Sequence, residues 1–127
     1  MPEYKALIVE DSSTMRHFLS FALQRIPGMV FQEAKDGIEA CKVLDRETFD
    51  VVLLDVNMPG MNGIQLLQRI RKDERFSGTR VIMITTEGSI DSQQEARELG
   101  ADGYVPKPVQ AQQVIETIKR LLAIQDA

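Results

Sequence analysis

Reactive side chains stand directly after four apolar segments of this chain, and together they suit the transfer of a phosphoryl group. The four pairings are Tyr4–Val9 with Glu10 and Asp11, Val51–Leu54 with Asp55, Arg80–Ile84 with Thr85, and Asp102–Pro106 with Lys107. If the segments are parallel strands, these side chains meet at the carboxyl edge of one sheet, where such sheets place their functional sites. An acid pair, a lone aspartate, a hydroxyl and an ammonium at one edge indicate phosphoryl chemistry on a carboxylate of the chain itself.

The three acids also predict a metal site. Glu10, Asp11 and Asp55 would crowd negative charge together, and two carboxylates roughly 4 Å apart repel by about 4 kcal/mol at an effective dielectric constant of about 20. A divalent cation among them removes this repulsion, and a set of oxygen ligands suits Mg²⁺. The alternative interpretation, in which the acids only cap strand ends, explains each acid singly but not the whole set of polar residues.

Asp55 is the candidate nucleophile, because an aspartate carboxylate can form an acyl phosphate. Such a transfer depends mainly on positioning and on neutralising charge. Lys107 can bind the phosphoryl group as a point charge, and Thr85 can donate its hydroxyl to a phosphoryl oxygen. Lys107 lies between Pro106 and Pro108, which restrict its backbone and favour a positioned lysine over a solvated one.

The elements that carry these residues alternate between strand and helix. Apolar strand segments near residues 4–9, 29–31, 51–54, 81–84 and 102–106 each precede an amphipathic stretch. Helical crossovers imply a parallel sheet, and the continuous apolar runs imply that helices cover both of its faces. The predicted fold is therefore α/β, with a doubly wound, five-stranded parallel sheet in a three-layer sandwich.

The spacing of apolar residues predicts which faces of the helices are buried. In the second helix we expect Ile38, Cys41 and Leu44 to face the core, with Cys41 as buried filler and not as a redox group. In the third helix the expected solvent side carries three basic residues, Arg69, Arg71 and Lys72. The segment Ser89–Leu99 is predicted to be a helix with few large apolar residues.

Composition and charge exclude several classes of protein. The net charge is −4 and the isoelectric point is near 5.0, whereas nonspecific binding to nucleic acid or to an anionic membrane needs a basic surface. The single cysteine, Cys41, excludes an internal disulfide and a cysteine-based metal cluster. We expect residues 1–127 to form one domain without an output domain, in a cytoplasmic monomer.

The chain resembles the receiver domains of two-component response regulators, in particular the stand-alone, CheY-like chemotaxis type. The resemblance covers the whole chain and depends on the order and spacing of four motifs: Glu10-Asp11, Asp55 to Gly63, Thr85-Thr86-Glu87 and Lys107-Pro108. It implies a flavodoxin-like (βα)5 fold and a phosphorylation-activated signalling switch, not an enzyme. A sensor histidine kinase would phosphorylate the protein, which would then change its affinity for a partner in chemotaxis, motility or a related phosphorelay.

The resemblance assigns a role to each residue at the sheet edge. Asp55 is implied to be the phosphoacceptor. It would bind Mg²⁺ together with the Asp11 side chain and the backbone carbonyl of Asn57, while Glu10 would act through a metal-bound water. Lys107 would contact the phosphoryl group. These roles require all five residues to lie around one point.

Other residues are implied to carry the signal away from the site. Thr85 would be the switch hydroxyl and Tyr104 the aromatic rotamer switch, and the bond before Pro108 would be cis. The expected partner surface combines Ser89–Leu99, the strand that holds Tyr104 and the start of the last helix. Phosphorylation would draw the threonine hydroxyl inward and let the tyrosine ring follow, which would change the surface that a partner meets.

Two positions depart from the family pattern. Thr86 stands where alanine or glycine is frequent, and its side chain would narrow the access to Asp55. Together with Asn57 and Glu87 it is expected to tune the rate at which phosphate is lost, either spontaneously or to a phosphatase. Val109 replaces a frequent phenylalanine, which would change the packing under the last helix.

Three other functions would use the same residues differently. A Mg²⁺-dependent phosphohydrolase acting on small phosphoesters would share Asp55 as its nucleophile, but Asn57 stands where such enzymes usually need a second acid. A degenerate receiver would serve only as a scaffold, which the intact set of site residues argues against. A flavodoxin-like cofactor binder would need a glycine-rich phosphate loop or an aromatic pair for a flavin, and the loops of this chain lack both.

His17 has no base partner in the sequence pattern and is interpreted as a surface residue.

Overall fold

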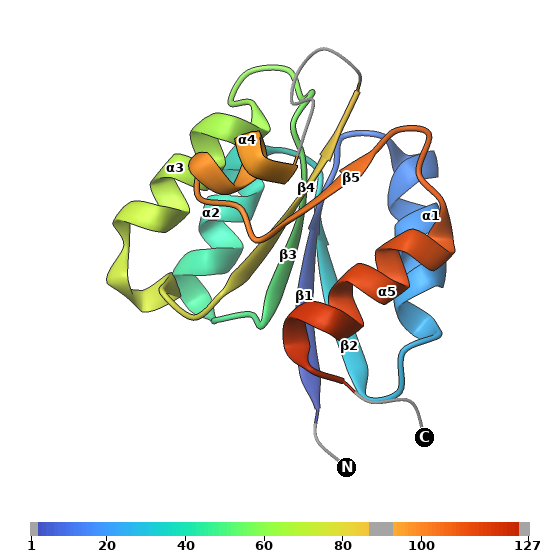
Figure 1. Ribbon diagram of the computed structural model, residues 1–127. Helices are drawn as coiled ribbons and strands as arrows, with labels where there is room; N and C mark the ends of the chain where they lie inside the picture. Colours follow the sequence, from blue (N-terminus) through green and yellow to red (C-terminus); the bar gives the residue numbers. More distant parts are fainter. Residues whose placement is uncertain (1–2, 87–92, 125–127) are drawn as a thin grey trace.

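A parallel five-stranded sheet forms the centre of the molecule, with the strand order β2-β1-β3-β4-β5 (Figure 1). The computed structural model describes residues 3–86 and 93–124. The elements are β1 (Tyr4–Val9), α1 (Ser13–Gln24), β2 (Met29–Ala34), α2 (Gly37–Arg46), β3 (Val51–Asp55), α3 (Gly63–Lys72), the 3₁₀ turn η1 (Glu74–Phe76), β4 (Arg80–Thr85), α4 (Gln93–Glu98), β5 (Gly103–Pro106) and α5 (Ala111–Leu122). The predicted doubly wound α/β fold is confirmed.

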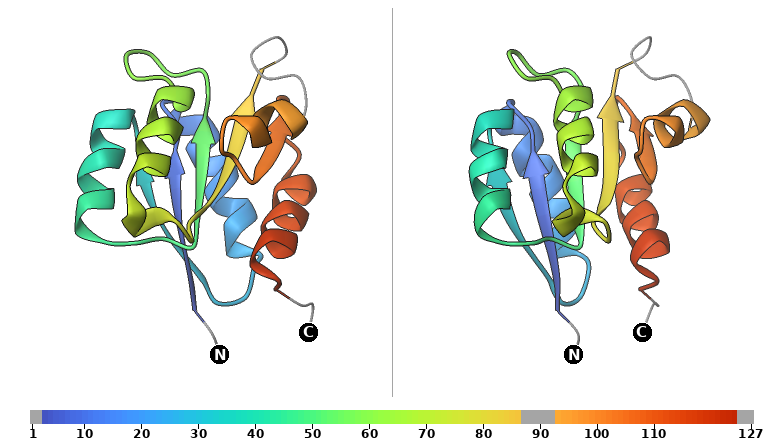
Figure 2. Two further views of the ribbon diagram at one scale, coloured as in Figure 1. Left: turned by 60° about the vertical axis from the view of Figure 1, so that its left-hand side comes forward. Right: turned by 90° about the vertical axis from the view of Figure 1, so that its left-hand side faces the viewer.

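The helices form two layers on opposite faces of the sheet. Helices α1 and α5 cover one face, and α2, α3 and α4 cover the other (Figure 2). Leu7 and Val9 of β1 pack in the core on the side of α2 and α3, whereas Ala6 and Ile8 pack against α1 and α5. Since both faces of the strand are buried, its sequence is a continuous apolar run.

Side-chain caps determine where the helices next to the carboxyl edge begin. Ser12 caps α1 and Asp36 caps α2, each by accepting a hydrogen bond from a backbone N–H group of the first turn. Asn62 and Gln65 form a capping box at the start of α3, in which each side chain accepts from the other's backbone N–H at 2.9 Å. These caps end the loops at the carboxyl edge at defined points.

The two ends of the loop that follows β3 are in contact with each other. The N–H group of Gly63 donates to the carbonyl of Val56 at 3.1 Å. Gly63 also lies so close to the carbonyl oxygen of Asp55 and to the Cα of Val56 that a side chain at this position would clash with the backbone. Glycine is therefore required where the loop of residues 56–63 returns to the strand that it left.

The prediction that Arg71 faces solvent on the third helix, α3, is wrong. Its side chain is 24% exposed and donates hydrogen bonds of 2.7–3.2 Å to four partners: the carbonyls of Gly100, Phe76 and Thr79 and the carboxylate of Asp102. We call this set of contacts the Arg71 clamp. It ties the C-terminal half of α3 to the turn between α4 and β5, which lies some 30 residues later in the chain.

The core face predicted for α2 is wrong for Ile38, which is 64% exposed. The buried residues of α2 are Gly37, Ala40, Val43 and Leu44. The two residue sets have similar helical spacing and share Leu44, which is buried as predicted. A Cβ atom at Gly37 would come within 2.9 Å of Met61 Sδ, so a small residue is needed at position 37. Cys41 is half-buried and packs against the core.

One strand boundary differs from the sequence prediction, and one predicted helix lies partly outside the described residues. Strand β2 continues to Ala34 instead of ending at Phe31, because its last residues pair with the end of β1. The helix expected over Ser89–Leu99 is observed as α4, and residues 89–92 lie outside the described part of the chain, as does Glu87.

No helix in the described ranges combines the length and the apolar character needed to cross a bilayer.

Candidate functional site

Asp55 is the last residue of the central strand β3 and is 1% exposed. Its Oδ1 atom accepts hydrogen bonds from Lys107 Nζ at 3.0 Å and from the backbone N–H of Asn57 at 3.1 Å. Its Oδ2 atom is buried and receives no hydrogen bond from any residue that the structure describes. The two oxygens of this carboxylate therefore differ: one is held by donors and the other lacks a partner.

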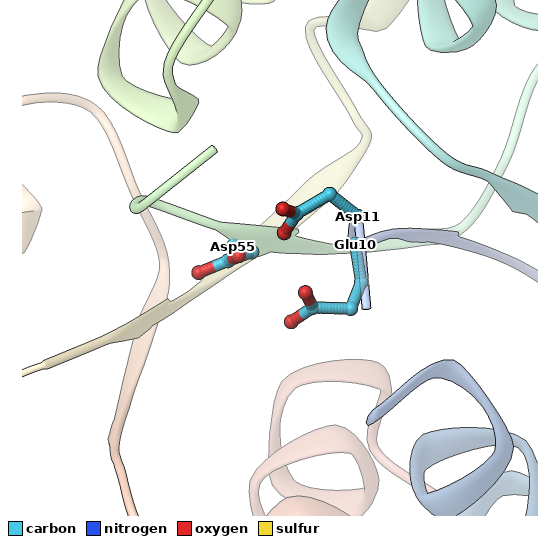
Figure 3. A group of neighbouring side chains, drawn as sticks. All are labelled: Glu10, Asp11 and Asp55. Atoms are coloured by element: carbon cyan, nitrogen blue, oxygen red, sulfur yellow. The ribbon is translucent and has the colours of Figure 1, made fainter. Parts of the chain in front are cut away.

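Glu10 and Asp11 follow β1, which is the neighbour of β3 in the sheet. Glu10 is 2% exposed and Asp11 is exposed. One oxygen from each of Glu10, Asp11 and Asp55 lies within 4.8 Å of the others (Figure 3). The three carboxylates, which the sequence places at the ends of two strands, thus form one cluster.

The pKa of Glu10 is raised to about 7. The main cause is burial, which disfavours the charged form, and the nearby charge of Asp55 acts in the same direction. The backbone N–H of Ser12, which donates to Glu10 Oε2 at 3.0 Å, lowers the pKa, and so does the charge of Lys107. Glu10 therefore changes protonation near neutral pH when no cation is bound.

The orphaned oxygens of the cluster test whether a cation would fit. Glu10 Oε1 and Asp55 Oδ2 are both buried, and neither has a hydrogen-bond donor in the described ranges. Buried carboxylate oxygens without donors are costly, and a cation among the three carboxylates would satisfy both atoms. A ligand set made only of oxygens suits a hard divalent cation. The donor set and its two unpartnered atoms therefore fit a metal.

Lys107 reaches the cluster from the connection between β5 and α5. Its backbone N–H donates to the carbonyl of Thr85 at 2.8 Å, and the peptide bond between Lys107 and Pro108 is cis. Its Nζ atom contacts Asp55 Oδ1, and the lysine side chain is 22% exposed. The structure thus brings four of the residues predicted for the site, Glu10, Asp11, Asp55 and Lys107, to one edge of the sheet.

Thr85 lies beside this cluster, at the end of β4, and is fully buried. Its hydroxyl donates to the carbonyl of Thr86 at 3.0 Å. Tyr104 lies on the edge strand β5, where it is half-buried and packs against the core on the side of α2 and α3. His17 is exposed on α1, in agreement with its interpretation as a surface residue.

A contact between Asn57 and Thr86 is absent from the sequence prediction. Asn57 Oδ1 accepts hydrogen bonds from both the backbone N–H and the hydroxyl of Thr86, at 3.1 and 3.0 Å. We call this pair the Asn57–Thr86 clasp. Since Asp55 pairs with Ile84 in the sheet, each clasp residue stands two positions beyond a paired residue. Once the order of the strands is known, this register could have indicated the contact.

Comparisons with known proteins agree with this geometry. A family model described as "Response regulator receiver domain" matches residues 6–119. A curated relative from Pseudomonas aeruginosa, "Chemotaxis protein CheY", is 42% identical over 117 residues, which are 92% of this chain and 94% of the relative. "Chemotaxis protein CheY1" from Helicobacter pylori is 39% identical over 123 residues, which are 96% of this chain and 99% of the relative.

Solved structures show the same similarity. The chemotaxis response regulator CheY4 of Vibrio cholerae superimposes with a TM-score of 0.83 at 34% sequence identity, and the match covers 94% of this chain and 98% of that one. The receiver domain of the Francisella response regulator 1452 gives a TM-score of 0.83 at 27% identity, with 95% and 98% covered. Both matches cover nearly the whole of each chain.

Proposed function

This chain belongs to the response regulator receiver family, and we propose that it is a phosphorylation-activated switch in chemotaxis or a related phosphorelay, with Asp55 as the phosphoacceptor. The observation that carries the proposal is the setting of Asp55. Its carboxylate is buried, faces two further acids, and has one oxygen held by Lys107 while the other has no donor in the described ranges. The names of the relatives from P. aeruginosa and H. pylori support a role in chemotaxis.

In this proposal the cation is Mg²⁺, which keeps several waters and binds both carboxylate and phosphate oxygens. Asp11 and Asp55 would hold it through their side chains, Asn57 through its backbone carbonyl, and Glu10 through a water. When bound, Mg²⁺ supplies positive charge against the phosphoryl oxygens. Lys107 supplies positive charge from the other side, because its Nζ atom lies 3.0 Å from Asp55 Oδ1.

The transfer itself is a displacement at phosphorus. A carboxylate oxygen of Asp55 attacks the phosphorus of a phosphohistidine on a sensor histidine kinase. A new O–P bond forms while the P–N bond breaks, and the imidazole leaves with the electron pair of that bond and takes a proton from solvent. Because the transition state is mostly dissociative, the residues contribute through position and charge more than through acid–base catalysis.

The switch then follows from Thr85 and Tyr104. We propose that the Thr85 hydroxyl, which now donates to the Thr86 carbonyl, turns to a phosphoryl oxygen. Tyr104, which is half-buried at the sheet edge, turns inward into the space that this movement leaves. Helix α4 is short and Ala96 is the buried residue among its described side chains. A helix with so few apolar contacts can shift at low cost.

The proposal includes the partners and the setting of the switch. A downstream protein would bind the surface formed by α4, β5 and the start of α5, and a phosphatase would return the switch to its resting state. We place the protein in the cytoplasm, as a monomer that acts through one receiver domain. No feature of the described residues favours the phosphohydrolase alternative over the switch.

Labelling by a small phosphodonor tests the proposal. The protein is incubated with acetyl phosphate and Mg²⁺, and its intact mass is measured. We expect one added phosphoryl group on the wild type and none on Asp55→Asn, since an amide is not a nucleophile. Asp45→Asn, which changes an exposed carboxylate on α2, is the matched control and should be labelled normally. Undiminished labelling of Asp55→Asn would refute the assignment.

A further inference from the structure

Arg16, in helix α1, contacts the backbone of the acid pair, Glu10 and Asp11. Its Nη1 atom lies 2.8 Å from the backbone carbonyl oxygen of Glu10 and 3.3 Å from that of Asp11. Its Nε atom lies 3.3 Å from Glu33 Oε1, at the end of β2, and the arginine side chain is 21% exposed. One guanidinium group thus joins the ends of β1 and β2 to the first turn of α1.

The acid pair needs such a donor because it lies beyond the sheet. Strand β1 ends at Val9, and its ladder with β2 ends with the hydrogen bond from the Glu10 N–H to the Ala34 carbonyl, at 3.0 Å. The carbonyls of Glu10 and Asp11 therefore have no strand partners, and backbone polar groups at a protein edge need a donor or water. A single nitrogen of Arg16 serves both carbonyls.

We propose that Arg16 is a positioning residue for the metal-binding acid pair. By holding the carbonyls of Glu10 and Asp11, it fixes the turn from which the two carboxylates extend to the side on which Asp55 lies (Figure 3). The inference rests on the proposed function, because the role of the acid pair as a Mg²⁺ site belongs to that function. Arg16 itself contacts neither the cation nor the reacting atoms.

The chemistry of the guanidinium group explains why arginine suits this position. It is planar, stays charged at all physiological pH values, and presents several N–H groups in a fixed arrangement. Arg16 uses this arrangement to bind two carbonyls and, through another nitrogen, the carboxylate of Glu33. A lysine ammonium is a compact point charge on a flexible chain, so at this position it would bind one carbonyl without reaching Glu33.

The effect of Arg16 is expected to be geometric. The charges that shift the pKa of Glu10 belong to Asp55 and Lys107, whereas the contacts of Arg16 with the acid pair are to backbone carbonyls. Removing the arginine should therefore loosen the turn and disperse the two carboxylates, instead of altering their charge. Groups that orient metal ligands in this way typically contribute about 10–100-fold to metal affinity.

Titration of the metal-free protein with Mg²⁺, followed by amide NMR, tests the inference. We expect Arg16→Ala to weaken Mg²⁺ binding by about tenfold and Arg16→Lys to restore part of the loss. Arg25→Ala is the matched control, because Arg25 lies just beyond α1, is exposed, and its side chain makes, among the described residues, one long hydrogen bond of 3.4 Å to Gln112. It should bind Mg²⁺ like the wild type.

Labelling with acetyl phosphate supplies a second readout. In Arg16→Ala the Mg²⁺ concentration needed for half-maximal labelling should rise by about tenfold, in line with the loss of affinity, while the labelling rate at saturating Mg²⁺ changes little. A loss of folding would lower the rate at every Mg²⁺ concentration, and amide signals from the distant strands β4 and β5 report whether the fold is intact.

Three outcomes would decide the matter. A folded Arg16→Ala protein with wild-type Mg²⁺ affinity overturns the inference. If Arg16→Ala does not fold, the same measurement on Arg16→Lys decides it: unchanged affinity overturns the inference and reduced affinity supports it. A wild-type protein that neither binds Mg²⁺ nor takes up a phosphoryl group overturns the proposed function, and is told apart from the first two outcomes because no variant is involved.

Discussion

Lys107 Nζ lies 3.0 Å from Asp55 Oδ1, and this contact joins the end of β3 to the residue that follows β5, across the intervening strand β4. The Lys107 backbone also donates to the carbonyl of Thr85 at the end of β4. Three consecutive strands are therefore tied together at one edge of the sheet. A change in charge at Asp55 acts directly on the end of β5, the strand that holds Tyr104.

Lys107→Met should strengthen Mg²⁺ binding and slow phosphorylation. Methionine keeps most of the length of the side chain but removes a positive charge that repels the cation. Loss of this repulsion should tighten binding by about three- to tenfold, which corresponds to roughly 1 kcal/mol. The measurement is a Mg²⁺ titration alongside Lys42→Met, which removes an exposed lysine of α2. Weaker binding by Lys107→Met would contradict the prediction.

The stability of the metal-free protein should fall as the pH rises through 7. The pKa of Glu10 is raised from 4.5 to about 7 in the folded state, so between these values the folded protein binds a proton that the unfolded chain has lost. This stabilisation is complete below pH 4.5 and disappears above pH 7. From pH 5.5 to 8, Glu10 should remove about 2 kcal/mol from the free energy of unfolding.

Urea denaturation in the presence of a chelator measures this pH dependence. Glu10→Gln should lack the loss of stability between pH 5.5 and 8, because its side chain does not titrate. Other groups can contribute to the profile, so the difference between the two proteins is the relevant quantity. Parallel profiles for the wild type and Glu10→Gln would show that burial does not raise the pKa of this residue.

Thr86→Ala should shorten the lifetime of phosphorylated Asp55. The Thr86 hydroxyl contributes one of the two hydrogen bonds of the Asn57–Thr86 clasp, and the side chain would narrow the path by which water or a phosphatase reaches the acyl phosphate. Losing a contact of about 0.5–1.5 kcal/mol should speed the decay by about two- to tenfold. Thr86→Val, which keeps the bulk and removes the hydroxyl, separates the two effects. Equal half-lives in all three proteins would rule out a role in gating.

Arg71→Met should destabilise the protein strongly for a residue on a surface helix. The Arg71 clamp supplies four hydrogen bonds to groups on η1, the following loop and the α4–β5 turn. Its loss should lower the free energy of unfolding by about 2–4 kcal/mol. Arg69→Met, at an exposed position of α3, should change it by less than about 0.5 kcal/mol. Similar urea midpoints for both variants would contradict this account.

Beryllofluoride, a mimic of the phosphoryl group, should shift amide signals well beyond the site. If Asp55 is coupled to the α4–β5–α5 surface, NMR signals from Thr86 to Gln112 should move when it binds in the presence of Mg²⁺. The coupling is expected to be about 1–3 kcal/mol, or a 5–150-fold change in the affinity of a partner for this surface. Shifts confined to the loops around Asp11 and Lys107 would show that the surface does not respond.

The proximity of the site residues could be predicted from the sequence, because it follows from the arrangement of the sheet alone. Glu10, Asp55 and Lys107 stand at the ends of apolar segments, and parallel strands bring such ends to one edge. The helical crossovers make the strands parallel, so the proximity of these residues needs no knowledge of side-chain contacts. The Arg71 clamp could not be predicted in this way, because it joins a helix to backbone carbonyls whose positions depend on the packed turn.

The exposed position of Ile38 shows a second limit of sequence patterns. Residues 38, 41 and 44 repeat at helical spacing, but so do the residues that α2 buries. The buried face includes Gly37, whose position lies close to Met61, in a loop that is distant in sequence. Such phase errors arise where small residues, here Gly37 and Ala40, form the packed face and carry no apolar signal.

The loop after Asp55 is closed at its base, so the position of the strand end does not depend on the length of the loop. Gly63 returns to Val56 and to the Asp55 carbonyl, so the two ends of the loop meet. Lengthening a closed loop adds little entropy cost, about 0.6 kcal/mol for each doubling. An insertion between the exposed residues Pro59 and Gly60 would therefore leave Asp55 in its place, whereas Met58 and Met61, which pack in the core, must be kept.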